Sequence, residues 1–77
     1  MMTLNEIKNA VNYEYYRIDD LVTAREHVIT ELNDGLNWCE TEREVVALFE
    51  DISEEHEKDQ DFIDALYDIA YELDIDF

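Results

Sequence analysis

Glycine and proline are almost absent from this sequence, which contains one glycine, Gly35, and no proline among its 77 residues. Strand-rich folds need many tight turns, and glycine and proline supply the backbone conformations of most such turns. The sequence therefore predicts an all-α fold. Helix start signals and apolar spacing divide the chain into a small bundle of three to four helices, and its length allows a single domain, residues 1–77.

Two threonines, each followed three residues later by a glutamate, mark helix starts. Thr3 with Glu6 and Thr41 with Glu44 have the pattern of a capping box, in which each side chain bonds the backbone N–H of the other residue. The first helix is expected to continue through 13–16, where alternating aromatic residues could instead form a short strand. No partner strand is available to such a segment, so helix is favoured.

The second and fourth helices are expected to start at acidic residues, because carboxylates cap helices well and suit the positive end of the helix dipole. The second helix would begin near Asp19 or Asp20 and end just before Gly35, a residue suited to the position after a last turn. The fourth would begin near 59–61. The sequence leaves open whether residues 4–34 form one helix or two.

Apolar residues recur at intervals of three and four, which is the spacing of one buried face per helix. Trp38 and Cys39, between the second and third helices, are also expected in the core. The remaining predicted core residues are Leu4, Ile7, Val11, Leu21, Ala24, Val28, Ile29, Leu32, Val45, Leu48, Phe49, Ile52, Phe62, Ile63, Leu66, Ile69, Ala70 and Leu73.

The size and the termini bound where such a domain could work. A chain of this length buries only about 60% of its unfolded surface, and a homodimer or a bound partner would relieve that small core. The single cysteine, Cys39, cannot form an intrachain disulfide, which fits a reducing compartment. Residues 1–6 lack the pattern of a signal peptide, and the longest apolar run, 45–49, is too short to cross a membrane. A cytoplasmic location in a host bacterial cell is expected.

Acidic residues outnumber basic residues by 22 to 5, which gives a formal net charge of −17. Direct binding to nucleic acid or to an anionic membrane is therefore excluded, because both partners need a basic surface. Disorder is not indicated, since 47% of the residues are apolar and 12% are aromatic. The charge is uneven: residues 40–77 hold fifteen acidic and two basic residues, whereas residues 1–39 hold seven and three.

Four carboxylates of the fourth expected helix recur at helical spacing and form one stripe, here called the acidic stripe: Asp61, Asp64, Asp68 and Glu72. Such a stripe is about 16 Å long, with a carboxylate every ~5.5 Å. Duplex DNA carries one charge per ~1.7 Å, so seventeen charges correspond to about 29 Å of duplex. Tyr67 and Tyr71 could flank the stripe as interface aromatics. Further acids extend it, and with them the predicted partner-binding set is Glu50, Asp51, Glu54, Glu55, Glu57, Asp59, Asp61, Asp64, Asp68, Glu72, Asp74 and Asp76.

Three less specific origins of the acidity fit this sequence less well. Ordinary solvated helix faces mix both signs of charge and gain glutamate–lysine pairs, which this chain has few bases to form. Adaptation to high salt is disfavoured by the many Ile, Tyr and Asn residues. A calcium loop around Gly35 fails, because Thr30, Leu32 and Thr41 stand where it needs acidic or amide side chains. No metal site or other cofactor is predicted.

No catalytic arrangement can be singled out. His27 and His56 do not have metal-ligand spacing with each other or with Cys39. His27 is expected on a helix surface and His56 in a loop. Carboxylate pairs are so abundant that any choice of acid and base would be arbitrary, and the sequence does not indicate an enzyme.

In its small size, extreme acidity, expected helices and acidic residues interleaved with tyrosine, the whole chain resembles phage-encoded DNA-mimic inhibitors, most densely over residues 51–76. This group includes anti-restriction proteins, some anti-CRISPR proteins and inhibitors of the nucleoid protein HU. The resemblance is one of character, and no site residue is transferred. It implies a protein that occupies the DNA-binding groove of a basic host DNA-binding protein.

The expected target is a nucleoid protein of the HU type, because such proteins read DNA by backbone and shape rather than by base sequence. A restriction enzyme, a CRISPR effector or RNA polymerase is the alternative target. The rival interpretation is a small helical adaptor or regulatory subunit that binds a protein partner through an apolar face, with its acidity serving solubility.

Overall fold

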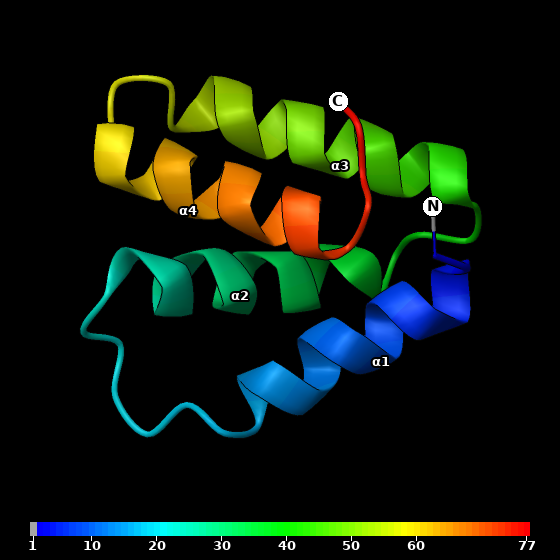
Figure 1. Cartoon of the computed structure of the whole chain (residues 1–77), viewed down its shortest axis with the longest axis horizontal. Helices are drawn as coiled ribbons and strands as arrows, with labels where there is room; N and C mark the ends of the chain where they lie inside the picture. Colours follow the sequence, from blue (N-terminus) through cyan, green and yellow to red (C-terminus); the bar gives the residue numbers. More distant parts are fainter. Residues whose placement is uncertain (1) are drawn as a thin grey trace.

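Four α-helices make up the described part of the chain, residues 2–77, in this computed structural model (Figure 1). They are α1 (Leu4–Tyr15), α2 (Ala24–Leu36), α3 (Glu42–Glu55) and α4 (Gln60–Glu72). No strand occurs among residues 2–77, which confirms the predicted all-α fold. The aromatic segment 13–16 is helical as far as Tyr15, so the preference for helix there is confirmed.

The predicted caps of α1 and α3 are present. The Thr3 hydroxyl accepts from the Glu6 N–H, and the Glu6 carboxylate accepts from the Thr3 N–H at 2.9 Å, which completes the capping box. At α3, the Thr41 hydroxyl accepts from the Glu44 N–H as expected. The Glu44 carboxylate, however, accepts from the N–H of Glu40 rather than from that of Thr41, so only one half of the predicted box forms.

The start of α2 differs from the prediction. Its N-cap is Thr23, whose hydroxyl accepts from the Glu26 N–H, and not Asp19 or Asp20. The Glu26 carboxylate accepts from the N–H of Thr23 at 2.8 Å and from that of Val22 at 2.9 Å. This box outweighs the acidic residues before it, because it satisfies several otherwise unpaired N–H groups. A non-helical connection therefore separates α1 from α2, and residues 4–34 form two helices.

Gly35 lies inside α2 and does not end it. Its φ is not positive, and the helix continues to Leu36 with Asn37 as C-cap. A Cβ atom at Gly35 would lie 2.5 Å from the Leu48 Cδ1 atom of α3. A side chain at this position would displace the flexible end of Leu48, and the backbone freedom that a helix end requires is not used here.

α2 is the central helix of the bundle. It packs against α1, α3 and α4, and a short turn joins α3 and α4 into an antiparallel pair (Figure 1). Full burial of an aliphatic side chain stabilises a fold by about 1.5–3 kcal/mol, so this shared core provides most of the favourable free energy. Its members are Ile7, Val11, Val28, Ile29, Leu32, Leu36, Cys39, Val45, Phe49, Ile52, Phe62, Leu66, Ile69, Ala70, Leu73 and Ile75.

Two predicted core residues are exposed instead. Leu21 is 50% exposed in the connection before α2, and Trp38 is 80% exposed in the link between α2 and α3. In that link, Cys39 is the residue that is buried. A further group of predicted core residues is only partly buried: Leu4, Ala24, Leu48 and Ile63.

The last residues of the chain fold back over α3 and α4 (Figure 1). Just after α4, the Ile75 N–H donates to the Ala70 carbonyl at 2.8 Å, and Asp74 takes the left-handed position of this turn with φ 56°. The turn directs Ile75 into the core. It also sets the ring of Phe77 against that of Tyr67, with the centroids 4.8 Å apart.

One arginine connects three helices. Arg25 of α2 bonds Glu14 of α1, with Nη2 2.9 Å from Oε1, and Glu72 of α4, with Nη1 2.7 Å from Oε2. A second bond joins Nη2 to the other oxygen of Glu72 at 2.9 Å, so this pair is bidentate. The hydrogen bonds from Arg25 hold the pKa of the Glu72 carboxyl below its usual value.

Replacing Arg25 with methionine is expected to lower Tm by about 4–8 °C, because the two half-exposed pairs together contribute about 1 kcal/mol. The variant also leaves Glu14 and Glu72 without their shared cation. The matched control is Arg43→Met in α3, since Arg43 is exposed and forms no ion pair within residues 2–77. Thermal unfolding by circular dichroism measures both variants, and equal losses would contradict a specific role for Arg25.

The two complete capping boxes make stability depend on pH. Hydrogen bonds from the backbone of Thr3 and Thr23 lower the pKa of the Glu6 and Glu26 carboxyls from 4.5. A carboxyl whose pKa is lower in the folded state stabilises the fold at pH values above its unfolded-state pKa. That contribution is lost as the pH falls below about 4.5 and through the folded-state pKa.

Replacing Glu6 and Glu26 together with glutamine is expected to make the free energy of unfolding fall less steeply over that acidic range. Glutamine keeps the hydrogen bonds of the box but does not titrate. Urea unfolding at a series of pH values measures this slope, and identical slopes for the two proteins would refute the assignment.

Candidate functional site

The acidic surface, defined as the twelve carboxylates predicted to bind a partner, is exposed throughout. It covers the second half of α3, the turn to α4, α4 itself and the C-terminal tail. Its members are Glu50, Asp51, Glu54, Glu55, Glu57, Asp59, Asp61, Asp64, Asp68, Glu72, Asp74 and Asp76.

Few of these carboxylates have a basic partner. Leaving Asp74 aside, Glu72 is the one member that pairs with an arginine or lysine within residues 2–77. Asp59 is the N-cap of α4 and accepts from the Phe62 N–H. Asp64 accepts from the Gln60 side chain at 2.8 Å. The surface therefore carries a dense negative charge that the protein itself hardly compensates.

The acidic stripe is shorter than the sequence suggests. Successive residues of a helix are turned by about 100°, so Asp61, Asp64 and Asp68 share one exposed flank of α4 away from the buried Leu66. Glu72 continues this flank, but its carboxylate points to Arg25 of the neighbouring helix. Three exposed carboxylates of α4 that form no ion pair within residues 2–77 remain available to a partner.

The carboxylates of α3 fall into two rows rather than one. Glu50 and Glu54 are one turn apart, as are Asp51 and Glu55, and the two rows are about 100° apart around the helix axis. Together with the stripe of α4, these rows spread the charge around the α3–α4 pair. A partner that approaches from any one side therefore meets only part of the twelve carboxylates.

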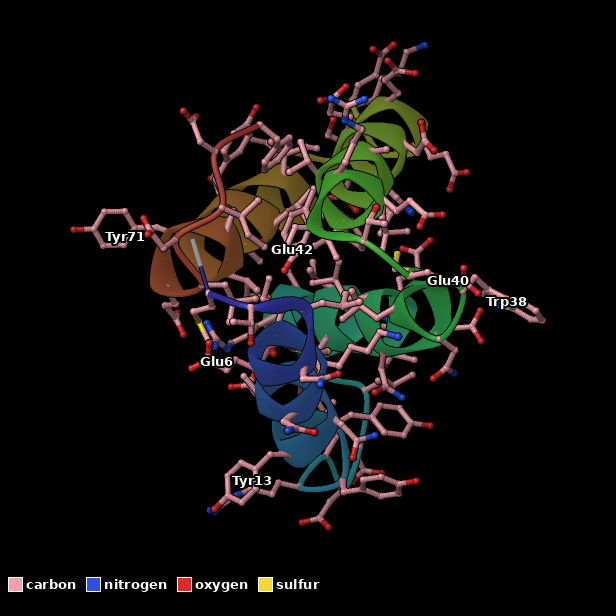
Figure 2. The ribbon with its side chains drawn as sticks, turned by 90° about the vertical axis from the view of Figure 1, so that its right-hand side faces the viewer. Glu6, Tyr13, Trp38, Glu40, Glu42 and Tyr71 are labelled. Atoms are coloured by element: carbon pink, nitrogen blue, oxygen red, sulfur yellow. The ribbon has the colours of Figure 1, made fainter. Side chains whose placement is uncertain are left out.

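The two tyrosines beside the stripe have different surroundings. Tyr71 is 88% exposed and points away from the molecule (Figure 2). Tyr67 is 51% exposed because the ring of Phe77 stacks on it. Trp38 points outward on the opposite side of the molecule from Tyr71 (Figure 2), so the most exposed aromatics do not form one patch.

A second cluster of titratable side chains is not predicted by the sequence. His56, the C-cap of α3, lies with Nε2 2.8 Å from Oε2 of Glu31 in α2. His27, one turn before Glu31, lines the same hollow together with Asp59 and Phe62. The spacing of the histidines along the chain gives no sign of this, because the packing of α3 against α2 creates the contact. His27 is exposed on a helix, as predicted, and His56 lies where α3 ends.

The one cysteine is poorly suited to nucleophilic chemistry. Cys39 is buried, and this burial raises the pKa of its thiol, which disfavours the reactive thiolate. Its thiol lies 3.7 Å from the Gly35 carbonyl oxygen and packs with the core. Its surroundings are those of a small apolar core residue.

No family model matches this chain, and comparison with curated proteins and with solved structures gives no significant match. Across residues 2–77, no helix has the length and apolar character needed to span a membrane. The chemistry of the exposed surface is therefore the basis on which a function can be inferred.

Proposed function

We propose that this protein is a DNA mimic that inhibits a bacterial DNA-binding protein by occupying its DNA-binding surface. One observation carries the proposal: the acidic surface is exposed around the α3–α4 pair, and within residues 2–77, leaving Asp74 aside, Glu72 is its one carboxylate that pairs with an arginine or lysine. Repulsion between such carboxylates destabilises the free protein. A partner that supplies lysine and arginine would relieve this repulsion, whereas ordinary solubility would require far less charge.

In the complex, the carboxylates of Asp61, Asp64 and Asp68 stand in for backbone phosphates and pair with basic side chains of the target. Long-range attraction steers the encounter and makes association fast at low salt. Binding also releases counterions from both surfaces, which favours the complex and makes it sensitive to salt. The backbone of the helical α3–α4 pair is already ordered, so only the side chains lose freedom on binding.

The target proposed first is a nucleoid protein of the HU type, acting in the cytoplasm of a host bacterium. Such a protein binds DNA through its backbone and its deformability and makes few demands on base edges. A surface of carboxylates can therefore bind such a protein without carrying groups that resemble bases. A restriction enzyme, a CRISPR effector or RNA polymerase is the alternative within the same mechanism.

A helical adaptor is the second candidate, because the half of the chain with less charge exposes large apolar side chains. Tyr16, Val22 and Trp38 are 77%, 78% and 80% exposed. Under this alternative, a protein partner covers such residues and the acidity maintains solubility. The apolar contact would strengthen or persist as salt is raised, whereas a charge contact would weaken.

The test is capture of partners from a bacterial lysate by the tagged full chain, with elution by a salt gradient. DNA mimicry predicts that the captured proteins bind DNA, elute at moderate salt and are displaced by added duplex DNA. Purified HU-type protein should then be captured directly and lose its duplex DNA to increasing amounts of this protein. A partner without DNA-binding activity that stays bound at high salt would refute the proposal and support the adaptor.

A further inference from the structure

A histidine and two glutamates converge where the end of α3 meets α2. Glu31 lies in α2, Glu55 is the last residue of α3, and His56 follows it as C-cap. One potential ligand atom from each of these three side chains lies within 4.8 Å of the other two. We propose that Glu31, Glu55 and His56 form a binding site for one divalent transition-metal ion of the zinc type. This inference does not rest on the proposed DNA mimicry, although Glu55 also belongs to the acidic surface.

The imidazole at this site is held in place before any metal arrives. The backbone N–H of His56 donates to the Ile52 carbonyl at 3.1 Å, which ties the backbone of His56 to the last turn of α3. Its ring stacks on the ring of Phe62 with the centroids 3.9 Å apart and an angle of 18° between the planes. The ring is thereby aimed at Glu31, with 2.8 Å between Nε2 and Oε2. A ligand that is oriented in advance loses less entropy when the metal binds.

The distance between His56 and Glu31 fits a small ion with little movement of these two side chains. Zinc binds imidazole nitrogen and carboxylate oxygen at about 2.0–2.2 Å in tetrahedral geometry, which places neighbouring ligand atoms about 3.3 Å apart. The 2.8 Å contact between His56 and Glu31 would therefore open by about half an ångström as the metal replaces the shared proton. Glu55 is exposed, so its side chain is free to swing in from the end of α3.

Further side chains with nitrogen or oxygen atoms line the hollow beside Glu31 and His56. A hollow of about 410 Å³ lies between α2 and the start of α4, and its lining includes His27, Glu31, His56 and Asp59. His27 and Glu31 are one helical turn apart, a spacing that puts both on one face of α2. A water would complete the tetrahedron as the fourth ligand.

The ligand set decides the class of ion. Calcium and magnesium prefer six or more oxygen ligands, whereas a site with imidazole and few carboxylates suits zinc, cobalt or nickel. The simpler alternatives are an ion pair between His56 and Glu31, or loose attraction of any cation to a protein of charge −17. Loose attraction does not discriminate between ions of equal charge, and a coordination site does.

Calorimetric titration of the full chain with Zn²⁺ is the first test, at about 0.15 M NaCl so that loose attraction is screened. We expect one tight equivalent of Zn²⁺ that excess Ca²⁺ or Mg²⁺ does not displace. His56→Gln and Glu31→Gln are expected to weaken it at least tenfold. The matched control is Glu57→Gln, which removes the same charge as Glu31→Gln from an exposed position outside the site.

A second readout guards against variants that lose their fold. Glu55→Gln removes a ligand from an exposed position at a helix end and should also weaken binding, while circular dichroism reports an unchanged helix content. Bound Co²⁺ should give the visible absorption of a four-coordinate site without a thiolate band, since Cys39 is not a ligand. Equal binding of Zn²⁺ by the parent protein and His56→Gln, displacement by Ca²⁺, or a thiolate band would overturn the proposal.

Discussion

Replacing Asp61, Asp64 and Asp68 together with asparagine is expected to weaken binding to the basic target about a hundredfold. Each carboxylate that meets a lysine or arginine contributes roughly 1 kcal/mol or more, so three together account for about two orders of magnitude. Asparagine preserves size and polarity and removes only the charge. Glu72 is left intact, because its loss would disturb Arg25 and with it the contact of α1, α2 and α4.

The matched control removes the same three charges elsewhere. Asp19, Asp20 and Asp34 are exposed and belong to the half of the chain with less charge, and Asp34 is the only one of them within a helix. Their replacement with asparagine should reduce binding only a fewfold, through the smaller net charge. Fluorescence anisotropy with purified HU-type protein measures both triple variants over a range of salt.

The two triple variants separate the mechanisms. DNA mimicry by the α3–α4 pair predicts a large loss and a weaker salt dependence for the first variant alone. Equal losses in both would mean that only total charge matters, and that the arrangement of the carboxylates contributes nothing. Full binding by both would contradict a charge-based interface and point to the exposed aromatic residues.

Local signals in the sequence predict the helices well but not all of their ends. α1 and α2 begin with the same kind of capping box, yet the acidic residues at 19–20 suggest a start for α2 that is several residues too early. The capping-box pattern of Thr23 and Glu26 is present in the sequence, and this pattern alone is sufficient to locate the start of α2. A paired box determines a helix start more reliably than acidic residues alone, because it satisfies specific backbone donors.

Tertiary contacts determine further features that no local pattern contains. The sequence predicts a helix end at Gly35, whereas this glycine lies within α2 and next to Leu48 of another helix. Helical spacing predicts that the acidic stripe is exposed. It does not predict the ion pair of Glu72 with Arg25, because these residues are 47 positions apart in the sequence. The approach of His56 to Glu31 likewise arises only when α3 packs on α2. Spacing predicts which face of a helix a residue occupies, and packing decides what that face meets.

Two leucines that the sequence assigns equally to the core are expected to differ greatly when replaced with alanine. Leu32 is fully buried in the central helix, so Leu32→Ala should cost about 3–5 kcal/mol, the transfer free energy plus that of the cavity left behind. A domain of this size has a total stability of roughly 4–12 kcal/mol, so a loss of this size removes a large fraction of it. Leu21 is 50% exposed, and Leu21→Ala should change the stability by less than about 0.5 kcal/mol.

Urea unfolding followed by circular dichroism measures both variants at the same protein concentration. Leu32→Ala is expected to shift the midpoint sharply or to be unfolded without urea, while Leu21→Ala follows the parent curve. A large effect of Leu21→Ala would mean that a second copy or a partner covers the connection between α1 and α2. A small effect of Leu32→Ala would contradict the central position of α2, on which the alignment of α3 and α4, and so of the acidic surface, depends.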